Sequence, residues 1–124
     1  MNSSMVTVLR EADYAVLRSD GYINKPAADR IKQEINALIK DGYRRFILNF
    51  AQSSIINSTG LSVLIGIIER MLELQGMLLF TNLTAANAET MEMMGLTEFA
   101  RILATEEEAR QLMEQAKPSA SSAR

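Results

Sequence analysis

The residues best suited to chemistry form one short run, Asn57-Ser58-Thr59, which is followed at once by Gly60 and a long apolar segment. Asn, Ser and Thr are the side chains that cap helix amino termini, so the run predicts that a helix begins here. Ser58 then lies at or next to the first turn, where unpaired amide groups and the helix dipole favour an anion. The run suits either helix capping alone, the commoner role of such residues, or a hydroxyl that accepts a phosphoryl group.

The composition removes most catalytic alternatives. With no Cys and no His in 124 residues, the chain has no thiol nucleophile, no Cys/His zinc site and no His base to activate a serine. A net charge of −2 and the absence of Trp argue against nucleic-acid binding, which favours basic surfaces and stacking aromatic rings. We therefore expect a protein that is not an enzyme, holds no cofactor or metal, and binds no nucleic acid.

The length and the ends of the chain indicate one domain in the cytoplasm. Residues 1–116 are expected to form the domain, and the small polar residues 117–124 a disordered tail. The first residues lack the basic segment and apolar run of a signal peptide. The longest apolar stretch, 61–74, contains Ser62, Glu69, Arg70 and Glu73, so no membrane span is expected.

The elements that must position the Ser58 run alternate between strands and helices. The patterns predict strands over 5–12, 14–19, 43–50 and 77–82, helices over 27–40, 60–75, 85–94 and 105–116, and an extended segment over 96–103. Asn24 is placed to cap the first helix. The apolar run 46–50 is typical of a strand buried on both faces at the centre of a sheet. This order predicts an α/β domain with a mixed four- to five-stranded sheet and helices packed mainly on one face.

Charged and Met-rich segments outside the Ser58 run are assigned to the surface and the core. The acidic residues 106–108 are expected to be a solvated first helical turn, and Arg45 a surface charge. The Met residues in the second half of the chain mainly fill the core. Met91 or Met93 is the exception, because either is a candidate for a partly exposed contact beside Ser58.

Several segments together resemble the STAS domain family, of the anti-sigma factor antagonist type. The strand Phe46-Ile47-Leu48-Asn49-Phe50, a loop and Asn57-Ser58-Thr59-Gly60-Leu61 resemble the family's apolar strand, loop and Asp-Ser-Ser/Thr-Gly-Leu signature before an apolar helix. Gly21-Tyr22-Ile23-Asn24 resembles the family's Gly-x-Leu/Ile-Asp corner. Segments 76–80 and 93–99 resemble its next strand and its Gly-Leu…Phe segment, so the likeness spans roughly residues 5–115.

The resemblance implies a bacterial regulator of transcription and signal transduction that works by partner switching. In this family the unphosphorylated antagonist binds an anti-sigma factor that is a serine kinase, and so releases that factor's target. The kinase then phosphorylates the signature Ser, and a phosphatase resets it. Carried over by position, the phosphoacceptor is Ser58 with Thr59 as its neighbour. The partner-binding residues are then Asn24, Asn57, Ser58, Thr59, Gly60 and Met93, and a monomer is favoured.

Two positions depart from the family pattern, because Asn57 and Asn24 stand where the family commonly has Asp. Asn can cap a helix, but it carries no charge and is a very poor base. Three functions stay open: a phosphorylation-switched antagonist, an unswitched STAS scaffold subunit of a signalling complex, and a small ligand-binding α/β domain. The third requires a pocket near Asn24, Asn57 and Ser58.

Overall fold

The computed structural model describes residues 5–115, so the tail expected at 117–124 lies outside the described residues. The chain begins with a hairpin of β1 (Met5–Arg10) and β2 (Ala15–Asp20). It continues through α1 (Lys25–Lys40), β3 (Arg45–Gln52), α2 (Ser58–Leu74), β4 (Met77–Thr81), α3 (Ala85–Met93), the 3-10 helix η1 (Leu96–Glu98), β5 (Arg101–Leu103) and α4 (Glu106–Gln115).

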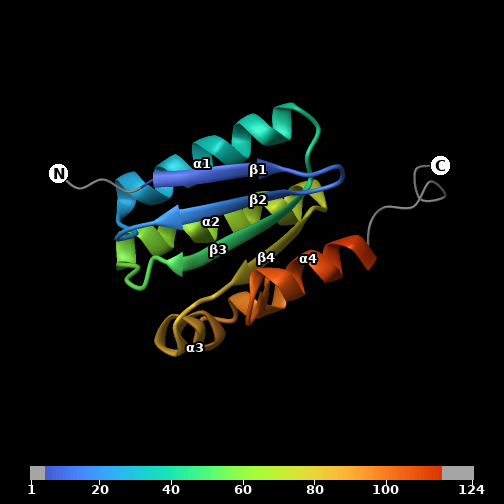
Figure 1. Cartoon of the computed structure of the whole chain (residues 1–124). Helices are drawn as coiled ribbons and strands as arrows, with labels where there is room; N and C mark the ends of the chain where they lie inside the picture. The colour runs from blue at the N-terminus through green and yellow to red at the C-terminus, as the bar shows by residue number, and fades with distance from the viewer. Residues whose placement is uncertain (1–4, 116–124) are drawn as a thin grey trace.

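The five strands form one mixed sheet in the order β1-β2-β3-β4-β5 (Figure 1). β1 is antiparallel to β2, and the remaining neighbours are parallel. β3 lies in the centre, where Phe46, Ile47 and Leu48 are buried. A strand covered on both faces needs apolar side chains in succession, which is the pattern that predicted its place.

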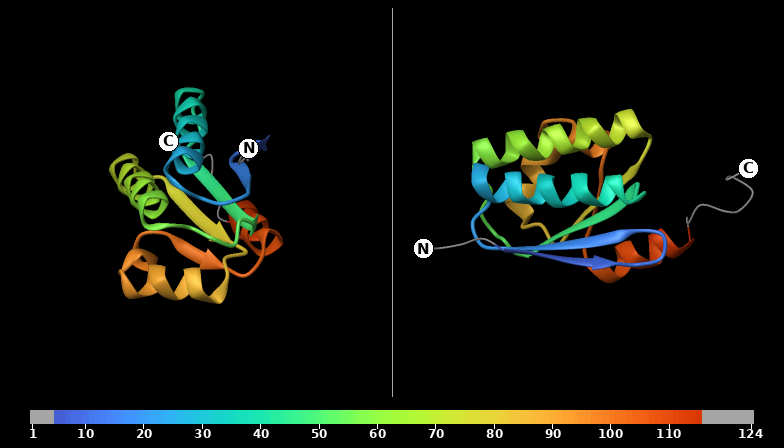
Figure 2. Two further views of the ribbon diagram at one scale, coloured as in Figure 1. Left: turned by 90° about the vertical axis from the view of Figure 1, so that its left-hand side faces the viewer. Right: turned by 90° about the horizontal axis from the view of Figure 1, so that it is seen from above.

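The helices form unequal layers on the two faces of the sheet. α1 and α2 cover one face, and α4 lies against the other (Figures 1 and 2). Successive strand residues point to opposite faces, so Phe46 and Leu48 join the larger core cluster with α1 and α2. Ile47 joins the smaller cluster beneath Ala109 and Met113 of α4. The prediction of a single α/β domain with helices mainly on one face is confirmed.

α1 and α2, the two helices of the larger core cluster, begin at the Asn caps that the sequence predicts. Asn24 Oδ1 accepts a hydrogen bond from the Ala27 amide at 3.1 Å, and Asn57 Oδ1 accepts one from the Gly60 amide at 2.8 Å. Each cap satisfies an amide that lacks a partner within its helix. α2 therefore begins at Ser58, two residues before the predicted start.

The prediction of an extended segment over 96–103 is wrong for its first half. Gly95, with φ of 76°, ends α3 in the left-handed region, and the chain then makes the short helix η1. Leu96 is buried in the core, and its carbonyl accepts a hydrogen bond from the Phe99 amide at 3.0 Å. Burial of this one side chain decides the local structure, and only Arg101–Leu103 pair with β4.

Candidate functional site

Two loops meet at the carboxyl-terminal edge of the parallel strands, and a backbone bridge holds them together. Ile23 and Ile56 form an isolated parallel bridge. The Ile23 amide donates to the Ile55 carbonyl at 2.9 Å, and the Asn57 amide donates to the Ile23 carbonyl at 3.0 Å. Asn24 and Asn57, more than thirty positions apart in sequence, therefore begin two neighbouring helices. Sequence reasoning placed each loop separately and missed this bridge.

Gly60 allows α2 to approach the other loop closely. A Cβ atom at this position would lie 2.4 Å from the Ile23 carbonyl oxygen and 3.2 Å from the Asn24 carbonyl oxygen. The first distance is shorter than any tolerated contact, so the position requires glycine. Gly60 is buried beneath the surface formed by the two loops, and the structure gives it the role of setting their spacing.

Ser58 and Thr59 lie exposed in the first turn of α2. Asn57 Oδ1 accepts hydrogen bonds from both the Gly60 amide and the Thr59 hydroxyl, at 2.8 and 2.9 Å. The Ser58 carbonyl accepts one from Ser62 Oγ at 3.1 Å. Within residues 5–115 the Ser58 hydroxyl itself makes no hydrogen bond. It therefore faces solvent, unpaired by any other residue that the structure describes.

The electrostatic surroundings of Ser58 favour an anion. α1 and α2 lie side by side and begin at the same edge (Figure 2). Neither helix carries an acidic side chain in its first turn. Each helix amino terminus has a partial positive charge of about half an electron, which acts over the first turn. A phosphoryl group at Ser58 would therefore meet two positive helix ends and no carboxylate from either first turn.

Large apolar side chains flank this polar run. Ile55 has 61% of its surface exposed, and Tyr22 has 49%. They lie in the two bridged loops, Ile55 next to Ile56 and Tyr22 next to Ile23. Exposed aromatic and aliphatic side chains gathered beside polar groups are typical of protein interaction surfaces. Sequence analysis did not single out either residue.

The amino-terminal part of α3 is tied to the same edge. Asn87 Nδ2 donates to the Ser54 carbonyl, in the loop before α2, at 3.0 Å. Met93, at the other end of this nine-residue helix, is 80% exposed. Met91 is buried, so of the two Met residues considered from the sequence only Met93 is available for contact. Its place in the partner surface remains a prediction.

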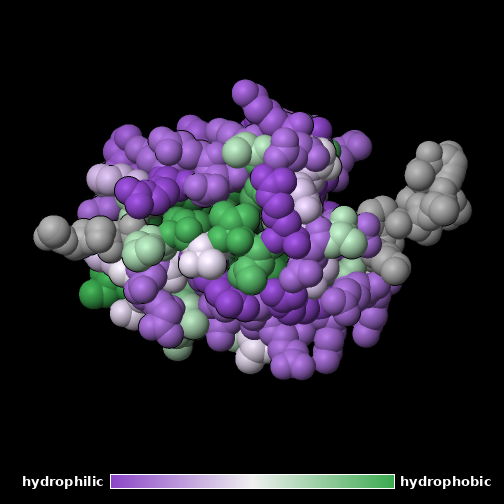
Figure 3. Space-filling model, turned by 45° about the horizontal axis from the view of Figure 1, so that its top comes forward, coloured by the Kyte–Doolittle hydropathy of each residue, from purple (hydrophilic) through white to green (hydrophobic). Residues whose placement is uncertain are grey.

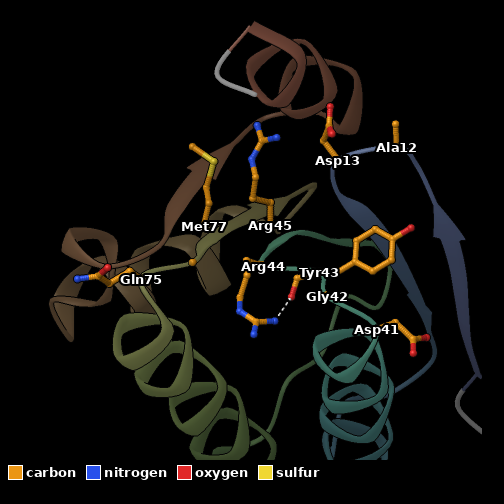
Figure 4. A pocket seen from close by; sticks show the side chains of 10 residues that line it. Ala12, Asp13, Asp41, Gly42, Tyr43, Arg44, Arg45, Gln75 and Met77 are labelled. Carbon is orange, nitrogen blue, oxygen red and sulfur yellow. Dashed lines mark hydrogen bonds between the residues drawn. The ribbon is translucent and has the colours of Figure 1, made fainter. Parts of the chain in front are cut away.

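Three hollows of the domain lie away from Ser58. They have volumes of about 690, 640 and 650 Å³, and none of the three is lined by Asn24, Asn57 or Ser58. The first lies at the opposite edge of the sheet, where β3 and β4 begin (Figure 4). There Arg44 donates to the Ile39 carbonyl at 3.0 Å, at the end of α1. A cation at a helix carboxyl terminus stabilises the unpaired carbonyl groups.

Arg45 extends to the other side of that hollow (Figure 4). Its guanidinium donates to the Met113 carbonyl of α4, and Arg45 is only 8% exposed. Burial lowers the pKa of Arg45, and Asp13 partly opposes this. The prediction of a surface charge is therefore wrong, because the long side chain crosses beneath α4 to reach its carboxyl-terminal turn.

The acidic turn of α4 differs from the prediction at one residue, Glu106. Glu106 accepts hydrogen bonds from Arg18, Asn49 and Arg110, each at 2.8 Å. The hydrogen bond from Arg18, with those from Asn49 and Arg110, lowers the pKa of Glu106 to about 2 although burial opposes the shift. Arg110 also pairs with Glu11 at 2.8 Å. A solvated turn was expected here, and Glu107 and Glu108 are exposed as predicted. The prediction is wrong for Glu106, which joins α4 to the sheet through Arg18 and Asn49. Its spacing of four residues to Arg110 signalled only the ion pair within the helix.

Other classes of site were sought over the part of the chain that the structure describes. Residues 5–115 contain no group of three or more His, Cys, Asp or Glu side chains that could hold a metal ion. No helix in the same range is long and apolar enough to cross a membrane.

Comparison with known proteins places the fold. No curated protein sequence matches the chain. The anti-sigma factor antagonist SpoIIAA in its unphosphorylated form has a TM-score of 0.73 and 19% identity, covering 89% of this chain and 98% of its own. Bacillus SpoIIAA in the phosphorylated form gives 0.71 and 22%, covering 88% and 99%. An anti-sigma factor antagonist from Mycobacterium paratuberculosis gives 0.76 and 18%, covering 90% and 95%.

The TM-scores of 0.73, 0.71 and 0.76 show a shared fold, and the family follows from the sequence. The sequence model of the STAS domain matches residues 5–109, which include every strand and the loops around Ser58. The matched residues run from the start of β1 into α4. The chain therefore belongs to the STAS domain family.

Proposed function

We propose that this protein is an anti-sigma factor antagonist whose binding to a serine-kinase-type anti-sigma factor is switched by phosphorylation of Ser58. The unphosphorylated form binds the kinase and releases its target, and a phosphatase restores that form. The protein acts in the bacterial cytoplasm as a binding protein and not as an enzyme. Its STAS fold and its structural likeness to anti-sigma factor antagonists support the general role.

The exposed Ser58 hydroxyl is the observation that carries this proposal. It lies in the first helical turn, outside the core, and has no hydrogen bond within residues 5–115. A kinase can therefore reach it without unfolding the domain. SpoIIAA has been solved in an unphosphorylated and a phosphorylated form with similar likeness to this chain, which supports a fold that accommodates both states.

A phosphoryl group at Ser58 has different effects on the fold of this domain and on its binding to a partner. A phosphoryl group adds about −1.5 to −2 charges at neutral pH, which the two helix amino termini favour within this domain. In a protein interface the same group adds charge and bulk where a small hydroxyl was accommodated. A loss of about 2.8 kcal/mol in binding free energy weakens a complex about 100-fold, so no rearrangement of the domain is required.

The partner surface that we propose is made by the two bridged loops. It comprises the polar residues Asn24, Asn57, Ser58 and Thr59, with Gly60 beneath them and Met93 at its margin. Tyr22 and Ile55 add exposed apolar area beside this polar group. Apolar residues next to small hydrogen-bonding groups are the usual content of an interface core and its rim.

The alternative of an unswitched STAS scaffold subunit is supported by one residue, Asn57. Asn57 caps α2 as an Asp would, but without a negative charge next to Ser58. An unswitched STAS scaffold subunit needs the same surface without its modification, and would keep this neutral cap. A ligand-binding α/β domain is less well supported, because none of the three hollows is lined by the Ser58 run.

Calorimetry with the kinase partner tests the proposal. We expect Ser58→Asp, which places a charge at the modified position, to weaken binding about 100-fold, and Ser58→Ala to bind within about threefold of the wild type. The free energy of unfolding of both variants should stay within about 0.5 kcal/mol of the wild type, since the position is exposed. Wild-type affinity in a folded Ser58→Asp variant would count against a switch at Ser58.

A further inference from the structure

β1 is an edge strand with its outer side unpaired by any described residue. It pairs with β2 in the register Met5 opposite Asp20 to Arg10 opposite Ala15, and no strand formed by residues 5–115 lies beyond it. The next pair of this ladder is hydrogen bonded, from the Glu11 amide to the Tyr14 carbonyl at 2.9 Å. Hydrogen-bonded pairs recur at every second residue in an antiparallel ladder. The amide and carbonyl groups of Val6, Val8 and Arg10 therefore point away from β2.

This edge lacks the features that usually prevent strands from pairing. The sequence of β1, Met-Val-Thr-Val-Leu-Arg, has no Pro and no Lys, and its one charge lies at the end. Natural edge strands are commonly interrupted by charges, Pro or bulges. Figure 3 shows an apolar patch over β1, and its residues Val6, Val8 and Leu9 are only partly buried while Met5 is 61% exposed. By contrast, β5 at the other edge has three residues.

We propose that this edge binds a second copy of the chain, with β1 antiparallel to β1 and the two-fold axis at Thr7. A two-fold axis perpendicular to the sheet keeps each side chain on its own face of the sheet. Residues that lie opposite each other therefore both have even numbers or both have odd numbers. Centring the axis on Thr7 places Val6 opposite the Val8 of the second copy, and both have outward amide and carbonyl groups. Met5 then lies opposite Leu9, and Thr7 opposite Thr7. Apolar and Thr–Thr pairs of this kind stabilise antiparallel strands.

The position of Arg10, the one charge of β1, favours this register over its neighbour. With the axis at Thr7, Arg10 lies beyond the Met5 of the second copy, so the paired segment contains no charge. With the axis at Val8, Arg10 would lie opposite Val6. Arg10 is held by an ion pair with Asp41 at 2.9 Å within its own subunit, which also favours keeping its side chain out of the contact.

The expected dimer is weak and leaves the Ser58 surface free. Pairing of two short strands buries less than the roughly 1,200 Å² of a stable interface, so we expect a dissociation constant of about 0.1–1 mM. The two-fold axis reverses the strand direction. The two Ser58 edges therefore point in opposite directions, and each copy could bind a separate partner. This inference does not depend on whether Ser58 is phosphorylated.

A single introduced cysteine tests the register, because the natural chain has none. Thr7 pairs with itself as a non-hydrogen-bonded pair, whose Cα atoms lie about 4.5 Å apart, within the range that a disulfide spans. We expect Thr7→Cys to form covalent dimers under mild oxidation about tenfold faster than Thr90→Cys, a matched exposed Thr on α3. Val8→Cys should be slower than Thr7→Cys, and the reverse order would overturn this register.

A charge at the same position tests the contact itself. Thr7→Glu places two carboxylates opposite each other across the axis, but next to Arg18 within each subunit, so the fold is retained. In sedimentation velocity at about 0.5 mM, the wild type should self-associate and Thr7→Glu should remain monomeric. Self-association by Thr7→Glu equal to that of the wild type would overturn the proposal. So would a monomeric wild type whose Thr7→Cys variant cross-links no faster than Thr90→Cys, and the edge would then be open to a strand from another protein.

Discussion

At the scale of residues, the geometry around Ser58 depends on two asparagines and one glycine. Asn24 and Asn57 each hold the first turn of a helix through a side-chain oxygen. Gly60 lets those helices begin close together, because its missing Cβ leaves room for the Ile23 carbonyl. Ser58 needs no such contact, and its hydroxyl stays exposed. Asn24, Asn57 and Gly60 therefore position the two helices, and Ser58 lies exposed between Asn57 and Gly60.

Replacing Gly60 by Ala should destabilise the domain. The added methyl group would lie 2.4 Å from a backbone oxygen that has little freedom to move. Overpacking of this kind costs about 1–3 kcal/mol, and we expect the free energy of unfolding in urea to fall by about 2 kcal/mol or more. The Ser58 surface should change as well, since its two loops must separate.

Gly66→Ala is the matched control in the same helix. No atom outside the helix lies within 4 Å of a Cβ at Gly66, which is exposed. Ala favours helix interiors over Gly by about 0.5–1 kcal/mol, so this variant should be slightly more stable than the wild type. Equal destabilisation by both substitutions would show that close approach at Gly60 is not what the position requires.

At the scale of elements, α4 is held to the sheet by charges as well as by its apolar side chains. Glu106 joins Arg18 of β2, Asn49 of β3 and Arg110 of its own helix. Tyr14 Oη adds a hydrogen bond to Glu114 at 3.1 Å. α4 contributes only Ala109 and Met113 to the fully buried core, so polar contacts carry a larger part of its attachment than they do for α1 or α2.

Glu106→Gln should loosen α4 in a pH-dependent way. The pKa of Glu106 is about 2 in the folded protein and 4.5 ordinarily, because of its donors Arg18, Asn49 and Arg110. The unfolded chain therefore takes up the proton first as the pH falls. The stabilisation is complete above about pH 4.5 and is lost as the pH falls to about 2. At pH 7 we expect the variant to lose about 1–2 kcal/mol in urea unfolding.

Glu107→Gln controls for the loss of one carboxylate in the same turn. Glu107 is exposed, and its substitution should change the free energy of unfolding by less than about 0.5 kcal/mol at pH 7. The difference between the wild type and Glu106→Gln should shrink in acid. A difference that stays constant from pH 7 to pH 2.5 would show that the carboxylate charge of Glu106 contributes nothing.

Local patterns and caps predicted most of these elements. The apolar run 46–50 and the Asn-Ser-Thr-Gly sequence required only neighbouring residues for their interpretation. The run lies in β3 as predicted, and α2 begins at Ser58, two residues before the predicted start. The failures at residues 96–99, Arg45 and Glu106 share a cause. Each is decided by a contact with a distant segment: the core for Leu96, α4 for Arg45 and the sheet for Glu106. A single sequence does not specify such contacts.

The candidate site shows the same division between local and distant contacts. Capping predicted that Asn57 precedes a helix with Ser58 in its first turn. The bridge between Ile23 and Ile56 pairs residues far apart in the chain, so the closeness of Asn24 and Asn57 came only from the family resemblance. The exposure of Tyr22 and Ile55 was also missed, because apolar residues in strand-edge loops do not reveal in sequence which way they point.

At the scale of the whole molecule, three surfaces lie at different edges of the sheet. The Ser58 edge lies at the carboxyl ends of the parallel strands, and the hollow bordered by Arg44 and Arg45 lies at their amino ends (Figures 1 and 4). The open side of β1 runs between those ends. A charge added at Ser58 is therefore remote from the hollow, and the proposed switch acts at one edge of an otherwise unchanged domain.

The most direct measurement is the site of phosphorylation. The purified protein would be incubated with ATP and the candidate serine-kinase partner, and the modified peptide would be located by mass spectrometry, with Ser58→Ala as the control. We predict one phosphoryl group on Ser58 of the wild type and none on Ser58→Ala. A Ser58→Ala variant that is modified to the same extent as the wild type, at Thr59 or elsewhere, would contradict the central claim.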